Sequence, residues 1–78
     1  MALIARFEQR PLTPKRIHEE VLCGYNAVQI GQRQILQLET YGSTDRKIPG
    51  KVSQSIQLDE GAARDLITII RTAFPGVG

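Results

Sequence analysis

Two segments of the chain carry polar side chains on alternate residues, and these side chains are the ones best suited to bind a ligand. They supply amides, hydroxyls, a carboxylate and a phenol, and they are Gln37, Glu39 and Tyr41 in the first segment and Ser53, Ser55 and Gln57 in the second. Amides and hydroxyls can hydrogen-bond phosphates and bases, and an aromatic ring can stack on a base. The pattern favours a nucleic-acid surface; a sheet face that contacts only water is the commoner alternative.

Lysine and arginine could supply the positive charge that such a surface needs. The net charge is +2, and it divides into +3 over residues 1–58 and −1 over residues 59–78. This excess before the last 20 residues favours an anionic partner, and a mixed solvated surface is the alternative. The residues predicted to bind nucleic acid, with Tyr41 stacking on a base, are Arg6, Arg10, Arg33, Tyr41, Arg46, Lys47 and Lys51.

The residue types and spacings do not form a catalytic or metal-binding motif. Seven residues separate Gly42 from Gly50 and Val52 follows Lys51, whereas a P-loop has four intervening residues and then Ser or Thr after its lysine. His18 and Cys23 are the only histidine and cysteine, too few for a closed zinc site. We expect a packed Cys23 thiol and a solvated His18, and we predict no enzyme activity, no metal and no cofactor.

Four segments have the alternation of apolar and polar residues that is typical of half-buried strands. They are residues 2–10, the two arms of a hairpin at 21–30 and 33–41, and residues 51–59. Gly31-Gln32 suits a type II′ turn between the arms. The segment 13–21 is expected to form a bend or one turn, and Gly42 and Pro49-Gly50 allow the chain to reverse between the last two strands.

The C-terminal segment is predicted to form an amphipathic helix. Asp59 is a good N-cap, and Pro75-Gly76 ends the helix. Apolar residues recur at helical spacing, at Ala63, Leu66, Ile67, Ile70 and Phe74. Further apolar residues beside this stripe indicate a helix–helix dimer interface, made by Ala62, Ile69 and Ala73. The alternative is a helix wedged between the sheet and the N-terminal segment.

These elements predict one α+β domain over residues 1–78, in which a four-stranded antiparallel sheet is followed by one helix (ββββα). A chain of 78 residues has a marginal core, and a single cysteine excludes an intrachain disulfide, so we expect a homodimer. No apolar run approaches the length of a membrane span, and the lone thiol suits a reducing compartment. We therefore expect a cytoplasmic protein without a membrane partner.

The C-terminal half resembles the p15-type family of transcriptional coactivators that bind single-stranded DNA, which are related in fold to the Whirly proteins. Four segments correspond to the family pattern: 35–41, 49–51, 56–58 and 59–70. The chain reads Val52-Ser53-Gln54 where the family has a basic-plus-glycine element. The resemblance implies a dimer whose helices meet and whose curved sheets bind single strands.

The sequence as a whole predicts a small nucleic-acid-binding module for single-stranded DNA or RNA, with little sequence specificity. The alternative is a protein-interaction or regulatory accessory module that acts through the open sheet edge or the helix face.

Overall fold

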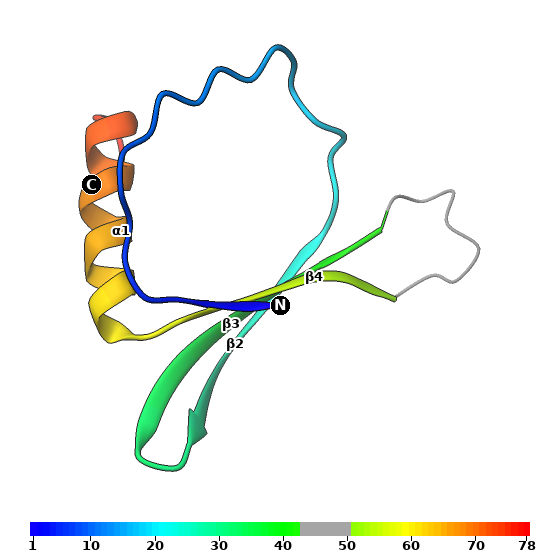
Figure 1. Cartoon of the computed structure of the whole chain (residues 1–78), viewed down its shortest axis with the longest axis vertical. Helices are drawn as coiled ribbons and strands as arrows, with labels where there is room; N and C mark the ends of the chain where they lie inside the picture. The colour runs from blue at the N-terminus through cyan, green and yellow to red at the C-terminus, as the bar shows by residue number, and fades with distance from the viewer. Residues whose placement is uncertain (43–50) are drawn as a thin grey trace.

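The computed structural model describes residues 1–42 and 51–78. Its elements follow the order β1 (Ala2–Ile4), β2 (Cys23–Ile30), β3 (Arg33–Tyr41), β4 (Val52–Leu58) and α1 (Glu60–Ala73). Figure 1 shows the helix standing at one side of a single sheet. The predicted α+β class and the ββββα order are confirmed.

The prediction of a fully antiparallel sheet is wrong, because the sheet is mixed. Its spatial order is β1-β4-β3-β2, with β1 parallel to β4 and the other pairs antiparallel. A parallel pair needs a long connection that carries the chain back across the molecule. The 18 residues at 5–22, between β1 and β2, allow the chain to return in this way.

The first strand is much shorter than the predicted segment 2–10, because its partner strand β4 ends opposite Ile4. Ala2 pairs with Ile56 and Ile4 pairs with Leu58, where β4 ends and the chain turns into α1. Residues from Ala5 onward consequently have no neighbouring strand to pair with, and an alternating pattern alone does not form a strand without a ladder.

The β2–β3 hairpin forms at the predicted turn. Gly31 has φ of 61°, and no other described residue has a positive φ. A positive φ at the first turn position and not at the second is the type II′ pattern, and it matches the right-handed twist of the two strands. The turn pairs Ile30 with Arg33 and thereby sets the register of the whole hairpin.

The register gives the sheet one apolar face and one polar face. Leu36 pairs with Leu58, and Leu38 pairs with Ile56. Because side chains alternate along a strand, one face collects most of the apolar residues. This apolar face consists of Ala2, Ile4, Tyr25, Ala27, Leu36, Leu38, Ile56 and Leu58.

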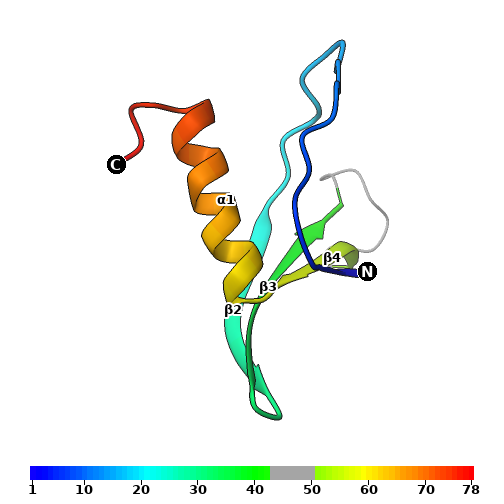
Figure 2. The same cartoon turned by 60° about the vertical axis from the view of Figure 1, so that its left-hand side comes forward.

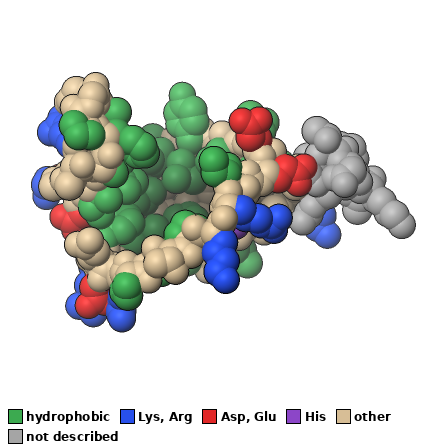
Figure 3. Space-filling view, turned by 90° about the horizontal axis from the view of Figure 1, so that it is seen from above, with side chains coloured by type: hydrophobic (Ala, Val, Ile, Leu, Met, Phe, Trp, Pro, Cys, Tyr) green, Lys and Arg blue, Asp and Glu red, His purple; other side chains and the backbone are tan. Residues whose placement is uncertain are grey.

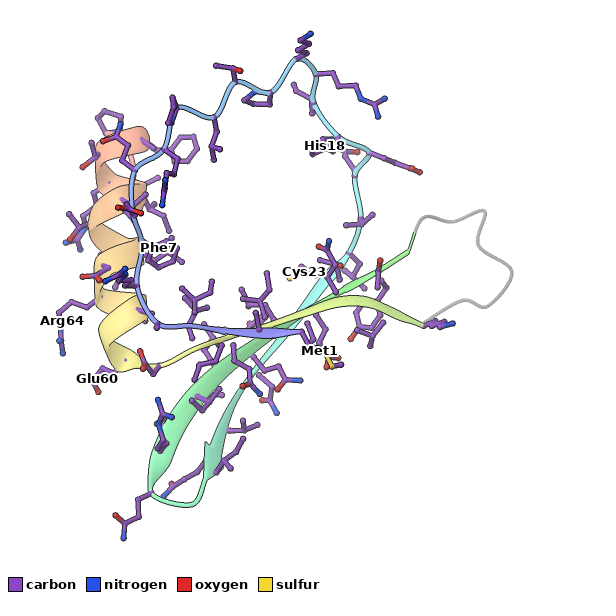
Figure 4. All side chains as sticks on the ribbon, in the orientation of Figure 1. Met1, Phe7, His18, Cys23, Glu60 and Arg64 are labelled. Carbon is purple, nitrogen blue, oxygen red and sulfur yellow. The ribbon has the colours of Figure 1, made fainter. Side chains whose placement is uncertain are left out.

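The helix begins at the predicted cap. The Asp59 carboxylate accepts a hydrogen bond from the backbone N–H of Ala62 at 2.9 Å, which satisfies one of the free amides of the first turn. Glu60 then pairs with Arg64 one turn later at 2.8 Å, and the two side chains extend from the start of the helix in Figure 4. At the other end, the Phe74 N–H donates to the Ile70 carbonyl.

The core is small and lies where the sheet meets the start of the helix. Among the described residues, only Ile35, Leu58 and Ala62 are buried apolar residues. Ala62 therefore packs inside the protomer, while Leu66 and Ile70 are half-buried on the helix. The described residues include no helix that is long and apolar enough to cross a membrane.

The prediction of a packed Cys23 thiol is wrong, because the helix covers only part of the apolar face. Cys23 is exposed, since it lies at the far end of β2, away from the hairpin turn and the start of α1. Phe74 is 62% exposed at the end of the helix, while Phe7 is half-buried. His18 is exposed, as expected.

The connection between β1 and β2, which we call the connecting segment (residues 5–22), forms no strand or helix and swings away from the sheet. It crosses the view of α1 and returns to β2 in a wide arc in Figure 1, and Figure 2 shows that it stands apart from the helix. The predicted bend falls at residues 15–16. Seen from above in Figure 3, a hollow lies between the helix and the rest of the chain, and hydrophobic side chains form much of its floor.

The helix cap provides a test of this fold. Replacing Asp59 with Ala should lower the free energy of unfolding by about 1 kcal/mol, because the Ala62 amide loses its acceptor. Asp59→Asn is the matched control: it keeps an acceptor oxygen but removes the charge that pairs with Arg33 at 3.2 Å, an exposed pair of little net value. Urea unfolding at one protein concentration measures both. Equal losses for Ala and Asn would contradict the capping role.

Candidate binding surface on the polar sheet face

The face of the sheet opposite the apolar face carries most of the polar side chains singled out in the sequence, together with the apolar Leu3, Val28 and Ile35. Asn26 of β2 pairs with Gln37 of β3, and Gln37 pairs with Gln57 of β4, so three amides form a row across three strands. In the next row, Glu39 lies between Gly24 and Ser55. We call this surface, made by Gly24, Asn26, Gln37, Glu39, Tyr41, Ser55 and Gln57, the polar face.

Hydrogen bonds order the centre of the polar face. The Gln57 side-chain amide donates to Gln37 Oε1 at 3.0 Å, and the Gln37 amide donates to Glu39 Oε2 at 2.7 Å. Both bonds are partly buried, and the second ends on a carboxylate, which strengthens it. The chain of bonds therefore holds the three side chains in fixed orientations, as a surface that recognises a ligand requires.

Tyr41 lies on the polar face directly over Gly24. A Cβ atom at position 24 would lie 2.8 Å from the Tyr41 hydroxyl oxygen and 3.3 Å from its Cε2. These distances are too short for any side chain at position 24 while the ring keeps its place. Gly24 thus provides the space that lets the half-buried ring rest against the sheet, and the same contact holds the ring near Glu39 and Asn26.

Two shallow hollows open on the polar face. One, of about 700 Å³, lies over β1, β4 and β3, and its lining includes Leu3, Gln37, Ser55 and Gln57. The other, of about 340 Å³, lies over β2 and β3, and its lining includes Gly24, Asn26, Gln37, Glu39 and Tyr41. Gln37 and Glu39 line both hollows, so these two side chains of β3 lie between two neighbouring recesses.

The structure places two of the predicted nucleic-acid contacts at the same end of the sheet. Tyr41 pairs with Val52 at the end of β3, so the backbone of Lys51 lies one residue beyond this pair, at the same end of the sheet. Arg33 begins β3 and lies roughly 26 Å away, at about 3.3 Å per residue along the strand. Arg46 and Lys47 lie outside the described residues.

The remaining predicted cations belong to the other end of the sheet. The chain leaves β1 next to the end of β4, which places Arg6 and Arg10 beyond the sheet on the connecting segment. Carboxylates also hold two of the arginines: Arg10 pairs with Glu8, and Arg33 with Asp59. A basic sheet face that includes the N-terminal arginines is therefore absent from the described part of the chain.

The fold buries one of the residues predicted for a helix–helix interface and leaves the other two exposed. Ala62 is 1% exposed within the protomer and has no surface to offer a partner. Ile69 is 42% exposed and Ala73 is exposed, so both lie on accessible helix surface. The helix thus offers a smaller free apolar surface than its sequence indicates.

Sequence reasoning missed Gly24 and Asn26 as parts of the polar face. The signal was present in the hairpin: a two-residue turn at Gly31-Gln32 pairs residues whose numbers sum to 63, which places Asn26 opposite Gln37. The space that Gly24 leaves for Tyr41 has no such signal, because it depends on the diagonal lean of one side chain across two strands.

Across residues 1–42 and 51–78, no group of three or more His, Cys, Asp or Glu side chains could hold a metal ion. Comparison with protein families, curated proteins and solved structures finds no match for this chain. A proposal about function therefore has to rest on the arrangement of the polar face.

Replacing Gly24 with Ala tests how Tyr41 is positioned. The added methyl group should push the ring off the sheet, because it would lie 2.8 Å from the phenol oxygen. The Tyr41 ring resonances should shift in NMR spectra, and those of Tyr25 on the other face should change little. Adding Tyr41→Phe removes the closest atom and should partly relieve the displacement. Unchanged Tyr41 resonances in Gly24→Ala would contradict this packing.

Proposed function

We propose that this protein binds single-stranded nucleic acid on its polar face, with a base stacked on Tyr41. The observation that carries the proposal is the seating of Tyr41 over Gly24, beside amides that hydrogen bonds hold in place. Stacking on an aromatic ring is largely independent of base identity, because every base has a π-face. Binding would thus show little sequence preference.

The side chains around Tyr41 suit the edges of an unpaired base. Asn26 and Gln37 present amides, which can both donate and accept hydrogen bonds. Glu39 lines the same hollow and can accept from an exocyclic amino group, as carboxylates do with cytosine. A carboxylate at this point disfavours a phosphate, so the bases would face the sheet and the phosphates would face outward.

The position of the cations implies a modest electrostatic contribution. Among the described residues predicted to contact phosphates, Lys51 is the one at the same end of the sheet as Tyr41. Arg33 is at the other end of β3 and already pairs with Asp59. Stacking and hydrogen bonding would consequently provide more of the affinity than charge does, and the dependence on salt would be shallow.

Changing Tyr41 to Leu should weaken oligonucleotide binding about tenfold, because loss of one base–aromatic stack removes roughly 1–3 kcal/mol. Tyr41→Phe should bind nearly as tightly as the wild type. Phe74→Leu is the matched control, since Phe74 lies at the end of α1, away from the polar face. Fluorescence anisotropy with short labelled DNA and RNA measures all four proteins. A wild-type chain that binds neither oligonucleotide at low salt would refute the proposal.

The salt dependence gives an independent check. Lys51→Gln should reduce the slope of log K against log salt by about 0.7, the value expected for one phosphate contact on a single strand. Arg33→Gln should leave the slope unchanged, because Arg33 lies at the far end of β3. The slopes come from anisotropy titrations at several salt concentrations. A larger effect for Arg33→Gln than for Lys51→Gln would place the binding surface elsewhere.

A protein-interaction module is the second candidate, and the exposed apolar side chains favour it. Leu12 and Ile17 on the connecting segment are 81% and 96% exposed, and Leu22 at its end is 73% exposed. Exposed apolar side chains that gather in a patch mark interaction sites. A protein partner retained after nuclease treatment, together with no binding of oligonucleotides, would favour this function.

A further inference from the structure

The two edges of the sheet differ in a way that bears on assembly. β1 forms one edge over three residues, whereas β2 forms the other over eight. Sheet edges are normally protected by short strands, charged side chains, proline or bulges. β2 has the sequence CGYNAVQI, with no charge and no proline, and its pairing with β3 is continuous from Cys23 to Ile30. It has none of these protections.

The free edge of β2 presents backbone groups in an alternating pattern. The Tyr41 N–H donates to the Leu22 carbonyl, which identifies position 22 as one whose backbone groups point toward β3. In an antiparallel pair these positions recur at every second residue. The even positions of β2 hence bond to β3, and the odd positions, Cys23, Tyr25, Ala27 and Gln29, point their N–H and C=O groups outward.

The protomer exposes far more surface than a compact chain of its size. Its accessible surface is 7196 Å², and a folded monomer of 8.7 kDa exposes about 4,700 Å². Its radius of gyration is 14.7 Å, compared with about 11.5 Å for a compact domain of 78 residues. The excess of about 2,500 Å² is several times the ~800 Å² that each partner buries in a standard interface. A stable association between copies therefore has ample surface to bury.

We propose that β2 pairs antiparallel with β2 of a second copy, with the two-fold axis passing beside Asn26. This register is the one in which all four outward residues of each strand meet outward residues of the other. Cys23 lies opposite Gln29 of the second copy, and Tyr25 lies opposite its Ala27. Each β2 strand has eight unpaired backbone N–H and C=O groups, and this pairing gives each of them a partner. The two four-stranded sheets thereby become one continuous sheet.

The side chains of β2 suit this register on both faces. On the apolar face, Tyr25 is 80% exposed in the single protomer and would cover the small side chain of the opposite Ala27. On the polar face, the two copies of Asn26 would meet at the axis and join the two amide rows. No like charges meet, because β2 carries none. The helix residues Ala62, Ile69 and Ala73 take no part in this contact.

A disulfide scan of β2 tests the pairing directly. In a Cys23→Ser background, Asn26→Cys places two thiols across a non-hydrogen-bonded pair, where Cα atoms are about 4.5 Å apart, within the range a disulfide accepts. Gln29→Cys is the matched control, because its two copies would lie six residues apart, roughly 20 Å. Mild oxidation followed by a non-reducing gel should convert most of the Asn26→Cys protein, and little of the Gln29→Cys protein, into covalent dimer.

Light scattering measures the mass of the wild-type protein in solution. This measurement tests the proposal even if one of the cysteine variants fails to fold. The expected mass is twice the 8.7 kDa of one chain. A wild-type monomer overturns the proposal, and so does a dimer whose Asn26→Cys variant cross-links no faster than Gln29→Cys. Because no nucleic acid is present in either measurement, the result is independent of whether the polar face binds single strands.

Discussion

One geometric constraint governs this molecule: a single 14-residue helix has to cover a four-stranded sheet, and it does so only at one corner. Burial is concentrated at Ile35, Leu58 and Ala62, where β3 and β4 meet the first turn of α1. The Asp59 cap fixes that first turn and so decides where the helix lies. Small domains stabilise a marginal core with a disulfide, a metal or a partner. A single cysteine cannot form an intrachain disulfide, and the proposed pairing at β2 would supply a partner.

The proposed binding and the proposed assembly would use different parts of the sheet. Its polar face holds an ordered row of amides and a tyrosine seated over glycine, and the uncharged β2 edge offers backbone groups to a second copy. Asn26 belongs to both, since it continues the amide row and marks the proposed two-fold axis. Pairing at β2 would place the two polar faces side by side in one sheet, so a longer single strand could contact both copies.

Local chemistry accounts for what the sequence predicted well. The Asp59 cap and the Gly31 turn depend on a few neighbouring residues, and the hairpin register follows from the turn length. The parallel placement of β1 could not be predicted, because the alternation over residues 2–10 does not show which strand is its partner or where that partner ends. The exposure of Cys23 and Phe74 depends on how far the helix extends over the sheet. The dispersal of the predicted cations could not be foreseen either, because their positions follow from the topology of the sheet. That topology places Arg33 and Lys51 at opposite ends of the sheet.

Amide hydrogen exchange along β2 tests most directly the claim that the protomer is completed by a second copy at this edge. The even-numbered amides, at Gly24, Asn26, Val28 and Ile30, should be protected by β3 in any case. The account predicts that the odd-numbered amides, at Tyr25, Ala27 and Gln29, are protected to a similar degree at high protein concentration and lose protection on dilution. Rapid exchange of the odd-numbered amides at every concentration, beside protected even-numbered ones, would show a free edge and contradict the account.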